Sequence, residues 1–316
     1  MAHPSTITIA LLIVLAAATH THPAHAVELW REATLEDFAK PGKYGMGTFV
    51  ASAPKASMFR ASYGTAPVSV FYPTLPEGGG DPNALADDGE TFHAIGFAHG
   101  AGASADWYTN LYRHLVSHGF VIVSVRNMAP VPATLGDDMC HGLAWIIAES
   151  LGNGTSGRGS AFFGRVDADA VGVAGHSMGG GGSMVCATQW PQKVKALAPI
   201  HPAPGAPASL VYVPMMVPTG AMDFVTSPML VKASVYDGSP SPKIMPVMNG
   251  VGHREPNGKR QVHGTHTRTH TRTHAHLATL FPPSLPFPPI AQASHNPPTR
   301  IPSYRFPFSS SLRDRR

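Results

Sequence analysis

The sequence predicts an α/β fold in which a mostly parallel sheet carries helices on both faces. Short apolar segments alternate with segments whose apolar residues recur at helical spacing, and this alternation is typical of strands joined by crossover helices. One segment, Phe120–Val125, is almost entirely apolar, the pattern of a strand buried on both faces. Hydrophobic residues make up 43% of the 316 residues and charged residues only 13%, which excludes a highly charged disordered chain.

The predicted strands are short apolar runs bounded by glycine, proline or polar loops. They are, in order, Val68–Tyr72, which Pro73 is expected to end, His93–Ala98, Phe120–Val125, Ala170–Ala174, Ala196–Ile200, Tyr212–Pro218 and Lys243–Met248. Three helices are predicted between them, because apolar residues recur there every three or four positions. These helices are Ser104–Ser117, with Gly119 just beyond its end, Asp138–Ser150 and Met178–Gln189.

The first 26 residues have the features of a secretory signal. Ile7–Ala18 is an apolar run of about twelve residues, whereas a helix that spans a bilayer needs roughly 20. The motif Ala24-His25-Ala26 follows it and is typical of a cleavage site. No Lys or Arg precedes the run, so an uncleaved amino-terminal anchor is the alternative. We expect a signal peptide over 1–26, a secreted domain over 27–258 and no integral membrane segment.

The secretory route would permit two covalent modifications. The sequon Asn153-Gly154-Thr155 lies in a Gly/Ser-rich loop and is a candidate glycan site. Cys140 and Cys186 lie on two predicted neighbouring helices. They either form a disulfide or are two small buried apolar residues, and neither has the surroundings of a nucleophile.

Positive charge is concentrated in residues 259–316. They hold nine Lys or Arg and one acid, whereas residues 1–258 hold 14 Lys or Arg and 18 acids. Nucleic-acid binding needs a basic patch on a folded face, so no nucleic-acid partner is expected. A four-residue repeat over Thr265–His274 is followed by closely spaced prolines. Metal binding by its histidines and attraction to acidic surfaces are alternatives, but we expect a disordered extension or translated non-coding sequence.

The first candidate catalytic residue is a serine in a glycine-rich turn. Gly175-His176-Ser177-Met178-Gly179 has the pattern G-x-S-x-G between a predicted strand and a predicted helix, which is the setting of a nucleophile elbow. Ser177 is therefore the candidate nucleophile, and the Met178 amide is placed to donate to an oxyanion. The glycine run continues to Gly182, which indicates that the helix and its neighbours pack very closely.

A serine hydroxyl needs a base, and the elbow is followed in the chain first by an acid and then by a histidine. Asp223 comes just after the predicted strand Tyr212–Pro218, and His253 follows Lys243–Met248. Both lie where parallel strands end, so we expect His253 to be the base and Asp223 to orient it. The alternatives are a turn-capping acid and a solvated loop histidine.

The turn His99-Gly100-Ala101-Gly102 follows the second predicted strand. A glycine-rich turn here can aim a backbone N–H into the site, and we assign that oxyanion role to Ala101. His99 is expected to buttress the turn. His201 follows the strand Ala196–Ile200 and is expected to line the pocket, with a rival base as the alternative.

These segments resemble the bacterial cutinases and polyester (PET) hydrolases. Gly175 to Gly182 resembles their elbow, His99–Val125 is similar to their oxyanion turn, first helix and next strand, and Asn249–His253 resembles their histidine loop. The resemblance runs from about Val68 to Asn257 and implies an α/β-hydrolase fold and carboxylic-ester hydrolysis. Chlorophyllases and platelet-activating-factor acetylhydrolase-like esterases share the broader superfamily, so the ester stays open.

The chain departs from that pattern in three places. The family carries an aromatic side chain where this chain has Ala101, and a tryptophan where it has His201-Pro202-Ala203. An open aromatic clamp for a flat polymer is therefore not predicted, although Trp107 and Tyr108 lie nearby and are candidates to replace it. The family continues into a last helix, whereas this chain continues as Gly258-Lys259-Arg260 and the repeat. One interpretation is that the domain lacks this last helix.

The resulting expectation is a secreted serine esterase that needs no cofactor and no metal. Its substrate is a small-molecule, lipid or polymer ester, with cutinase-like or lipase-like activity, and chlorophyll or phospholipid acyl esters are alternatives. Trp107 and His201 are the candidate substrate-binding residues. A hydrolase fold with an impaired site that binds an apolar ligand or a partner is the second hypothesis. The oligomeric state is left open.

Overall fold

The computed structural model describes residues 39–55, 64–75, 84–128 and 131–257. All of them belong to one compact unit. The expected signal peptide over 1–26 and the expected tail over 259–316 lie outside the described residues. No helix in the described ranges is both long enough and apolar enough to cross a membrane.

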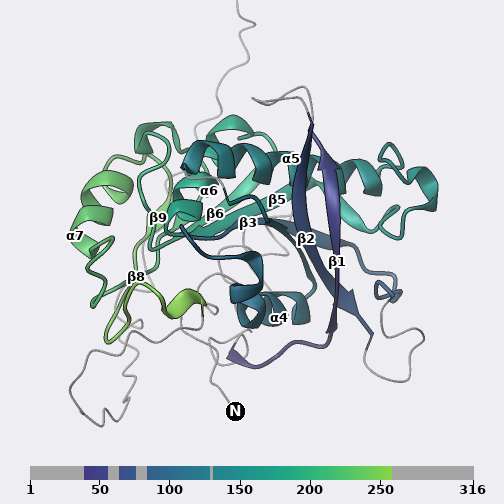
Figure 1. Ribbon diagram of the computed structural model, residues 1–316, viewed down its shortest axis with the longest axis horizontal. Helices are drawn as coiled ribbons and strands as arrows, with labels where there is room; N and C mark the ends of the chain where they lie inside the picture. Colours follow the sequence, from purple (N-terminus) through teal and green to yellow (C-terminus); the bar gives the residue numbers. More distant parts are fainter. Residues whose placement is uncertain (1–38, 56–63, 76–83, 129–130, 258–316) are drawn as a thin grey trace, which may run out of the picture. The chain divides into compact units, whose positions relative to one another are not determined.

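A central eight-stranded sheet organises the described chain (Figure 1). Its strands, in spatial order, are β1 (Gly45–Pro54), β2 (Thr65–Thr74), β4 (Phe120–Val125), β3 (Phe92–Ala98), β5 (Val166–His176), β6 (Val194–Ile200), β7 (Met215–Met216) and β9 (Lys243–Ile244). Strand β2 is antiparallel to both of its neighbours, and every pairing from β4 to β9 is parallel. The predicted fold class, a mostly parallel sheet of the α/β-hydrolase type, is confirmed.

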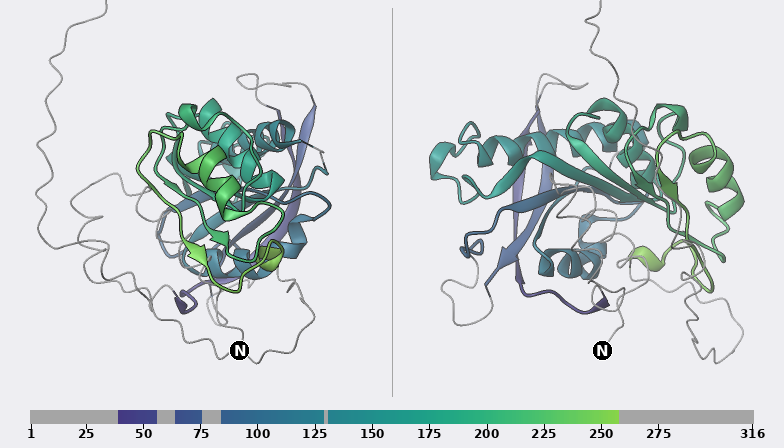
Figure 2. Two further views of the ribbon diagram at one scale, coloured as in Figure 1. Left: turned by 90° about the vertical axis from the view of Figure 1, so that its left-hand side faces the viewer. Right: turned by 180° about the vertical axis from the view of Figure 1, so that it is seen from behind.

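Helices cover both faces of this sheet, which separates the core into two clusters (Figures 1 and 2). Helices α5 (Pro132–Ser150) and α6 (Met178–Gln189) bury apolar side chains in the first cluster, and α4 (Thr109–Ser117) does so in the second. Strand β4 supplies both clusters alternately: Val121 and Val123 face the first, and Ile122 faces the second. This two-residue alternation explains why every residue of the strand except Ser124 is apolar; Ser124 is buried and its hydroxyl bonds to Tyr112.

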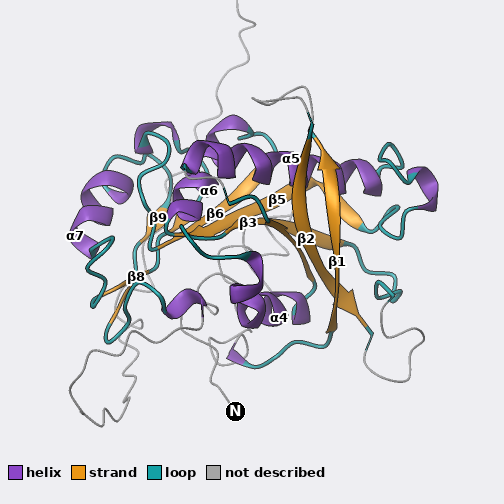
Figure 3. Cartoon of the chain, in the orientation of Figure 1, coloured by secondary structure: helices purple, strands orange, loops and turns teal. Residues whose placement is uncertain are grey.

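The remaining elements are short (Figure 3). They are the 3-10 turn η1 (Ala105–Tyr108) before α4, η2 (Gly157–Gly159), η3 (Ala208–Leu210), α7 (Pro228–Val231) with a π-helical turn η4 (Lys232–Tyr236), η5 (Glu255–Asn257), and the strands β8 (Thr219–Gly220) and β10 (Val247–Met248). Strands β8 and β10 pair in parallel as a separate small sheet. That pairing brings the loops after them to the same edge.

Proline limits two of the predicted strands. Of Tyr212–Pro218 only Met215–Met216 joins the sheet, between Pro214 and Pro218. The predicted strand Lys243–Met248 is divided at Pro246 into β9 and β10, which belong to different sheets. Both predictions were wrong in length, because proline has no N–H to donate to a neighbouring strand.

Other boundaries also differ from the predictions, among them the end of β2 and the start of α5. Strand β2 does not end at Pro73 but continues to Thr74, since it pairs there with β1, a strand that the apolar pattern did not predict. Helix α5 begins at Pro132 rather than Asp138, with proline at its first turn, where no N–H is needed. Asp138 therefore lies inside the helix, buried, with its carboxylate 3.1 Å from the Lys55 ammonium.

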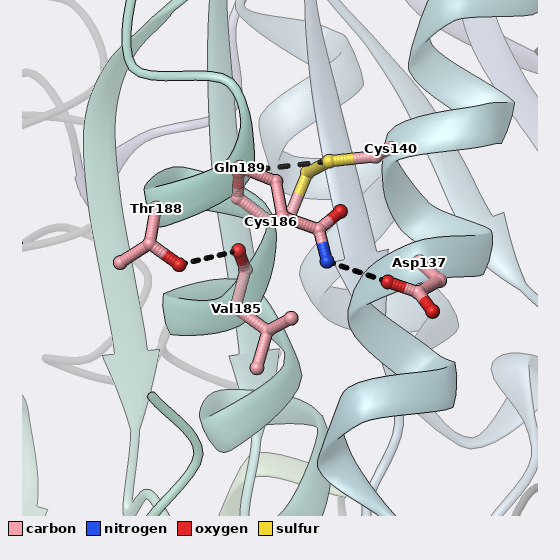
Figure 4. The surroundings of a disulfide bond; sticks show 6 residues. All are labelled: Asp137, Cys140, Val185, Cys186, Thr188 and Gln189. Atoms are coloured by element: carbon pink, nitrogen blue, oxygen red, sulfur yellow. Dashed lines mark hydrogen bonds between the residues drawn. A yellow bond between two sulfur atoms is a disulfide. The ribbon is translucent and has the colours of Figure 1, made fainter. Parts of the chain in front are cut away.

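A disulfide joins α5 to α6 (Figure 4). The Cα atoms of Cys140 and Cys186 are 5.6 Å apart. The sequence left open either a disulfide or two small buried apolar residues, and the structure contains the disulfide. The Gln189 side-chain amide donates to the Asp137 carboxylate at 2.6 Å beside it. The helix that follows the predicted nucleophile is thus covalently attached to its neighbour.

Candidate active site

Ser177 occupies a strained turn between β5 and α6. Its φ and ψ are 55° and −117°, a positive φ that costs a residue with a side chain about 1–3 kcal/mol. Backbone hydrogen bonds hold the turn on both sides: Ser177 donates to the Ile200 carbonyl at 2.9 Å, and Ala203 donates to the Ser177 carbonyl at 2.9 Å. The strain is therefore supported by the neighbouring strand β6 and the loop after it.

Close backbone packing under the turn explains the glycine run. A Cβ on Gly179 would overlap the Ala98 carbonyl and would lie 2.6 Å from the His99 carbonyl oxygen. At the crossing of α5 and α6, a Cβ on Gly136 would lie 2.6 Å from the Gly182 carbonyl oxygen. As the sequence predicts, the start of α6 packs directly on the turn after β3, with no room for a side chain.

The structure brings the three predicted residues of the triad into one hydrogen-bonded line. Ser177 Oγ lies 2.9 Å from His253 Nε2, and His253 Nδ1 lies 2.8 Å from Asp223 Oδ2. The carboxylate can only accept, so Nδ1 carries the proton and Nε2 is left to accept from the serine hydroxyl. Asp223 follows β8 and His253 follows β10, so the parallel pairing of these two strands places the acid and the base together.

Asp223 is a buried carboxylate with many donors. Its Oδ1 accepts from the backbone N–H groups of Val225 and Thr226 at 2.9 and 2.8 Å. Its Oδ2 accepts from His253, from the Thr226 hydroxyl at 2.9 Å and from His201 at 2.6 Å. Burial alone would raise the pKa of Asp223, but the hydrogen bonds from His201, His253 and Thr226 outweigh it and hold that pKa well below its ordinary value. The group therefore stays ionised.

His201 lies behind this carboxylate. Its side chain is fully buried, and its Nδ1 donates to Asp223 at 2.6 Å. It has a φ of 44°, and its backbone N–H donates to the Pro218 carbonyl at 2.9 Å. Its full burial does not fit the expected place on the pocket wall. The sequence shows only that His201 directly follows a predicted strand next to the elbow. It contains no feature that pairs His201 with Asp223.

His201, Asp223 and His253 also offer donor atoms within 4.8 Å of one another, a set that could hold a metal ion. In tetrahedral zinc sites with bonds of about 2.0–2.1 Å, neighbouring ligand atoms are roughly 3.3 Å apart. Here each imidazole Nδ1 lies at 2.6 or 2.8 Å from the same carboxylate oxygen, which is hydrogen-bond length. The arrangement fits two N–H donors on a carboxylate better than three ligands around an ion.

The two backbone amides expected to form the oxyanion hole, those of Met178 and Ala101, lie after β5 and after β3. Met178 is the first residue of α6, where amides have no partner within the helix. Ala101 is exposed in the turn after β3. The amide before it, that of Gly100, already donates to the Tyr108 hydroxyl at 3.1 Å. His99 is buried, and its Nδ1 lies 2.9 Å from the Gly100 carbonyl oxygen, which is the buttressing contact expected for it.

The two aromatic residues near the oxyanion turn differ in exposure. Trp107 is 39% exposed and Tyr108 only 1%. Tyr108 is therefore part of the core and cannot serve as a surface clamp. The exposure of Trp107 is compatible with the substrate contact expected for it.

His176, the variable residue of the elbow motif, has a role that the sequence did not indicate. It is buried, its Nδ1 lies 2.8 Å from the Tyr108 hydroxyl, and its Nε2 lies 2.7 Å from the His253 carbonyl oxygen. Burial, together with the smaller effects of the neighbouring His253 and His201, lowers its pKa to about 3. His176 is therefore neutral at physiological pH.

Comparison with known proteins places this chain in a family. The PET hydrolase-like family model matches residues 46–263. The chain is 26% identical over 216 residues to cutinase est2 of Thermobifida alba, covering 67% of this chain and 64% of the relative. It is 28% identical over 161 residues to cutinase 2 of Thermobifida cellulosilytica and to cutinase cut1 of Thermobifida fusca, covering 49% of this chain and 52% and 42% of those relatives. The chain thus spans between about two fifths and two thirds of the length of these relatives. On the extent of the family match, the chain belongs to the PET hydrolase-like family of α/β-hydrolases.

Proposed function

We propose that this protein is a serine carboxylic-ester hydrolase. The observation that carries the proposal is the hydrogen-bonded line from Ser177 Oγ through His253 to Asp223, with separations of 2.9 and 2.8 Å. In such a line the histidine can take the serine proton while the ionised carboxylate stabilises the imidazolium. The lowered pKa of Asp223 supports this role, because the group keeps its charge.

The reaction would proceed in two halves. Ser177 attacks the ester carbonyl carbon, its proton passes to His253 Nε2, and the carbonyl oxygen becomes an oxyanion facing the Ala101 and Met178 amides. Collapse of this intermediate expels the alcohol, which takes the proton from His253. Water then attacks the acyl-enzyme and gives a proton to His253, and His253 passes that proton to Ser177 Oγ as the acid leaves, which restores the free enzyme.

An apolar ester is the substrate class that the surroundings favour. Met222, Phe224 and Val225 flank Asp223 in the chain and are 38%, 72% and 62% exposed. The relatives are named cutinases, so cutin-like, lipid and polyester substrates are proposed, with chlorophyll and phospholipid acyl esters as alternatives. Within this set, small soluble or lipid esters rank above a flat polymer, because Ala101 and the buried His201 offer no aromatic clamp at their positions.

Secretion is proposed with the function. The Cys140–Cys186 disulfide requires an oxidising compartment in most organisms. The sequon residue Asn153 is exposed and accessible to a glycan. Together with the apolar run and the motif Ala24-His25-Ala26, these features support a cleaved signal over 1–26.

The test is labelling with a fluorophosphonate probe, which reacts with a serine activated by its base and oxyanion donors. The wild type should be labelled and Ser177→Ala should not. Ser183→Ala is the matched control, because Ser183 is a buried serine of α6, the helix after Ser177, and its hydroxyl donates to the Gly180 carbonyl at 2.7 Å. Labelling of Ser183→Ala alongside the wild type, followed by hydrolysis of p-nitrophenyl esters of increasing acyl length, would support the proposal. A folded wild type that takes no label would favour the impaired, ligand-binding hydrolase fold instead.

A further inference from the structure

A second line of hydrogen bonds connects the oxyanion turn to the histidine loop without passing through the triad side chains. The Gly100 amide lies 3.1 Å from the Tyr108 hydroxyl, which lies 2.8 Å from His176 Nδ1. His176 Nε2 lies 2.7 Å from the backbone carbonyl oxygen of His253. These three contacts join the turn after β3, the 3-10 turn η1, the end of β5 and the loop after β10.

The chemistry of the groups fixes the direction of every bond in this line. A carbonyl oxygen only accepts, so His176 Nε2 must carry the proton that goes to His253. A neutral imidazole then has a bare Nδ1, which accepts from the Tyr108 hydroxyl. The hydroxyl oxygen in turn accepts from the Gly100 N–H. Each donor has an acceptor, so the network is satisfied in one arrangement only.

Burial makes this arrangement rigid. Tyr108 is 1% exposed and His176 is 3% exposed, so water does not compete for these bonds. The rings of His176 and His253 also pack with their centroids 4.9 Å apart. A buried donor or acceptor that loses its partner costs about 1–3 kcal/mol, so breaking the line at one point leaves an unfavourable group behind.

We propose that His176 and Tyr108 are positioning residues that hold the oxyanion turn and the His253 loop in register on either side of Ser177. Gly100 precedes Ala101, the assigned oxyanion donor, and the carbonyl that accepts from His176 Nε2 belongs to His253, the assigned base. His176 is itself the residue before Ser177. The donor, the nucleophile and the base are thereby tied to one pair of buried side chains. This inference rests on the proposed esterase function.

Two amide substitutions at His176 separate the two halves of the line. An Asn amide falls near the position of imidazole Nδ1, so His176→Asn can keep the contact with Tyr108 but cannot reach the His253 carbonyl. A Gln amide falls near Nε2, so His176→Gln can keep the donation to His253. Removal of one hydroxyl by Tyr108→Phe breaks the link to Gly100.

Tyr112→Phe is the matched control for Tyr108→Phe. Tyr112 lies one turn further along, is fully buried, and its hydroxyl bonds to Ser124 at 2.9 Å rather than to the site. Both substitutions remove one buried hydroxyl, so similar losses of thermal stability are expected. A purely structural role of Tyr108 would make the two variants behave alike in every assay.

The expected result is a loss of kcat without a change in KM. Displacing a catalytic group by about 1 Å can lower the rate about 100-fold. We therefore expect His176→Asn and Tyr108→Phe to lower kcat toward a p-nitrophenyl ester by about 10-fold to 100-fold. His176→Gln should recover most of that loss, and Tyr112→Phe should stay near wild type. Equal losses in His176→Asn and His176→Gln, or in Tyr108→Phe and Tyr112→Phe, would overturn the proposal.

A spectroscopic readout separates this inference from the proposed function. Nitrogen-15 NMR of histidine-labelled protein should show His176 as the neutral Nε2–H form, and His176→Asn but not Tyr112→Phe should shift the His253 ring signals. If the wild type hydrolyses no ester and takes no fluorophosphonate, the esterase proposal fails while the NMR result still decides the positioning role. A His176 signal of the Nδ1–H form, or an unmoved His253 signal in His176→Asn, would contradict it.

Discussion

His201 donates to Asp223 Oδ2 at 2.6 Å, closer than the 2.8 Å at which the proposed base His253 donates to the same oxygen. Two histidines therefore share one carboxylate, and one of them has no access to solvent. Of the two histidines, it is His253 whose Nε2 lies 2.9 Å from Ser177 Oγ. His201 instead supports the charge of Asp223, and this separation of tasks can be tested by removing its donor.

Replacing His201 by Phe should destabilise the protein by about 1.5–3 kcal/mol, the usual contribution of a buried hydrogen bond to a charged group. It removes a donor that lowers the pKa of Asp223, so that pKa should rise toward its ordinary value. His201→Asn should lose less, because Asn tolerates a positive φ such as the 44° observed here and keeps a donor. Urea unfolding of the three proteins at pH 7 measures the effect. Equal stability of wild type and His201→Phe would show that the bond contributes nothing.

Gly179→Ala should impair both folding and activity. The added Cβ would overlap the Ala98 carbonyl at the start of the oxyanion turn, and overpacking of this kind costs about 1–3 kcal/mol. Gly159→Ala is the control, because a Cβ there meets no atom within 4 Å. Thermal unfolding and fluorophosphonate labelling rates should separate the two variants. A fully active and stable Gly179→Ala would mean that the turn can move away freely.

Reduction of the Cys140–Cys186 disulfide should lower stability without removing the fold. The bond closes a loop with a sequence separation of 46 residues, and disulfides of this kind stabilise by about 2–4 kcal/mol. Denaturant unfolding with and without reductant measures the difference. The Cys140→Ala, Cys186→Ala double variant should match the reduced wild type and should no longer respond to reductant. A wild type whose unfolding is insensitive to reductant would argue against the bond.

His176 should make the folded state sensitive to acid. Its pKa is about 3 when folded against an ordinary 6.5, so below pH 6.5 the unfolded chain binds a proton that the folded chain does not. Stability should therefore fall as pH decreases from 6.5 toward 3, by about 1.4 kcal/mol per pH unit from this group. His176→Gln lacks this titrating group. As pH decreases, the unfolding free energy of His176→Gln relative to that of wild type should therefore rise by about 1.4 kcal/mol per pH unit.

Tyr112→Phe serves as the control for this pH dependence, because it leaves His176, Tyr108, His201, His253 and Asp223 in place. Its stability relative to wild type should be independent of pH between 6.5 and 4.5. Unfolding free energies from urea titrations at several pH values give the comparison. Parallel pH curves for wild type and His176→Gln would mean that the buried imidazole takes up its proton in the folded state as readily as in the unfolded chain.

Strand and helix segments with a strong local pattern were predictable from the sequence. Phe120–Val125 and Met178–Gln189 have the predicted boundaries, because apolar periodicity and flanking glycine act within a few residues of the chain. Strand β1 escaped prediction since its burial is mixed, and it is defined by its pairing with β2. The two proline-interrupted strands were overextended, because local apolarity does not report whether an N–H is available for pairing.

The sequence by itself determined the parallel α/β architecture and the candidates Ser177, Asp223 and His253, since motif, chain order and strand ends are all properties of local segments. Only the tertiary structure decided the disulfide and the partners of the candidate site. His201 meets Asp223 across 22 residues, Tyr108 meets His176 across 68, and His176 meets His253 across 77. Such contacts depend on which strand ends the sheet places side by side. That order follows from the packing of the whole core, which no short segment of sequence encodes.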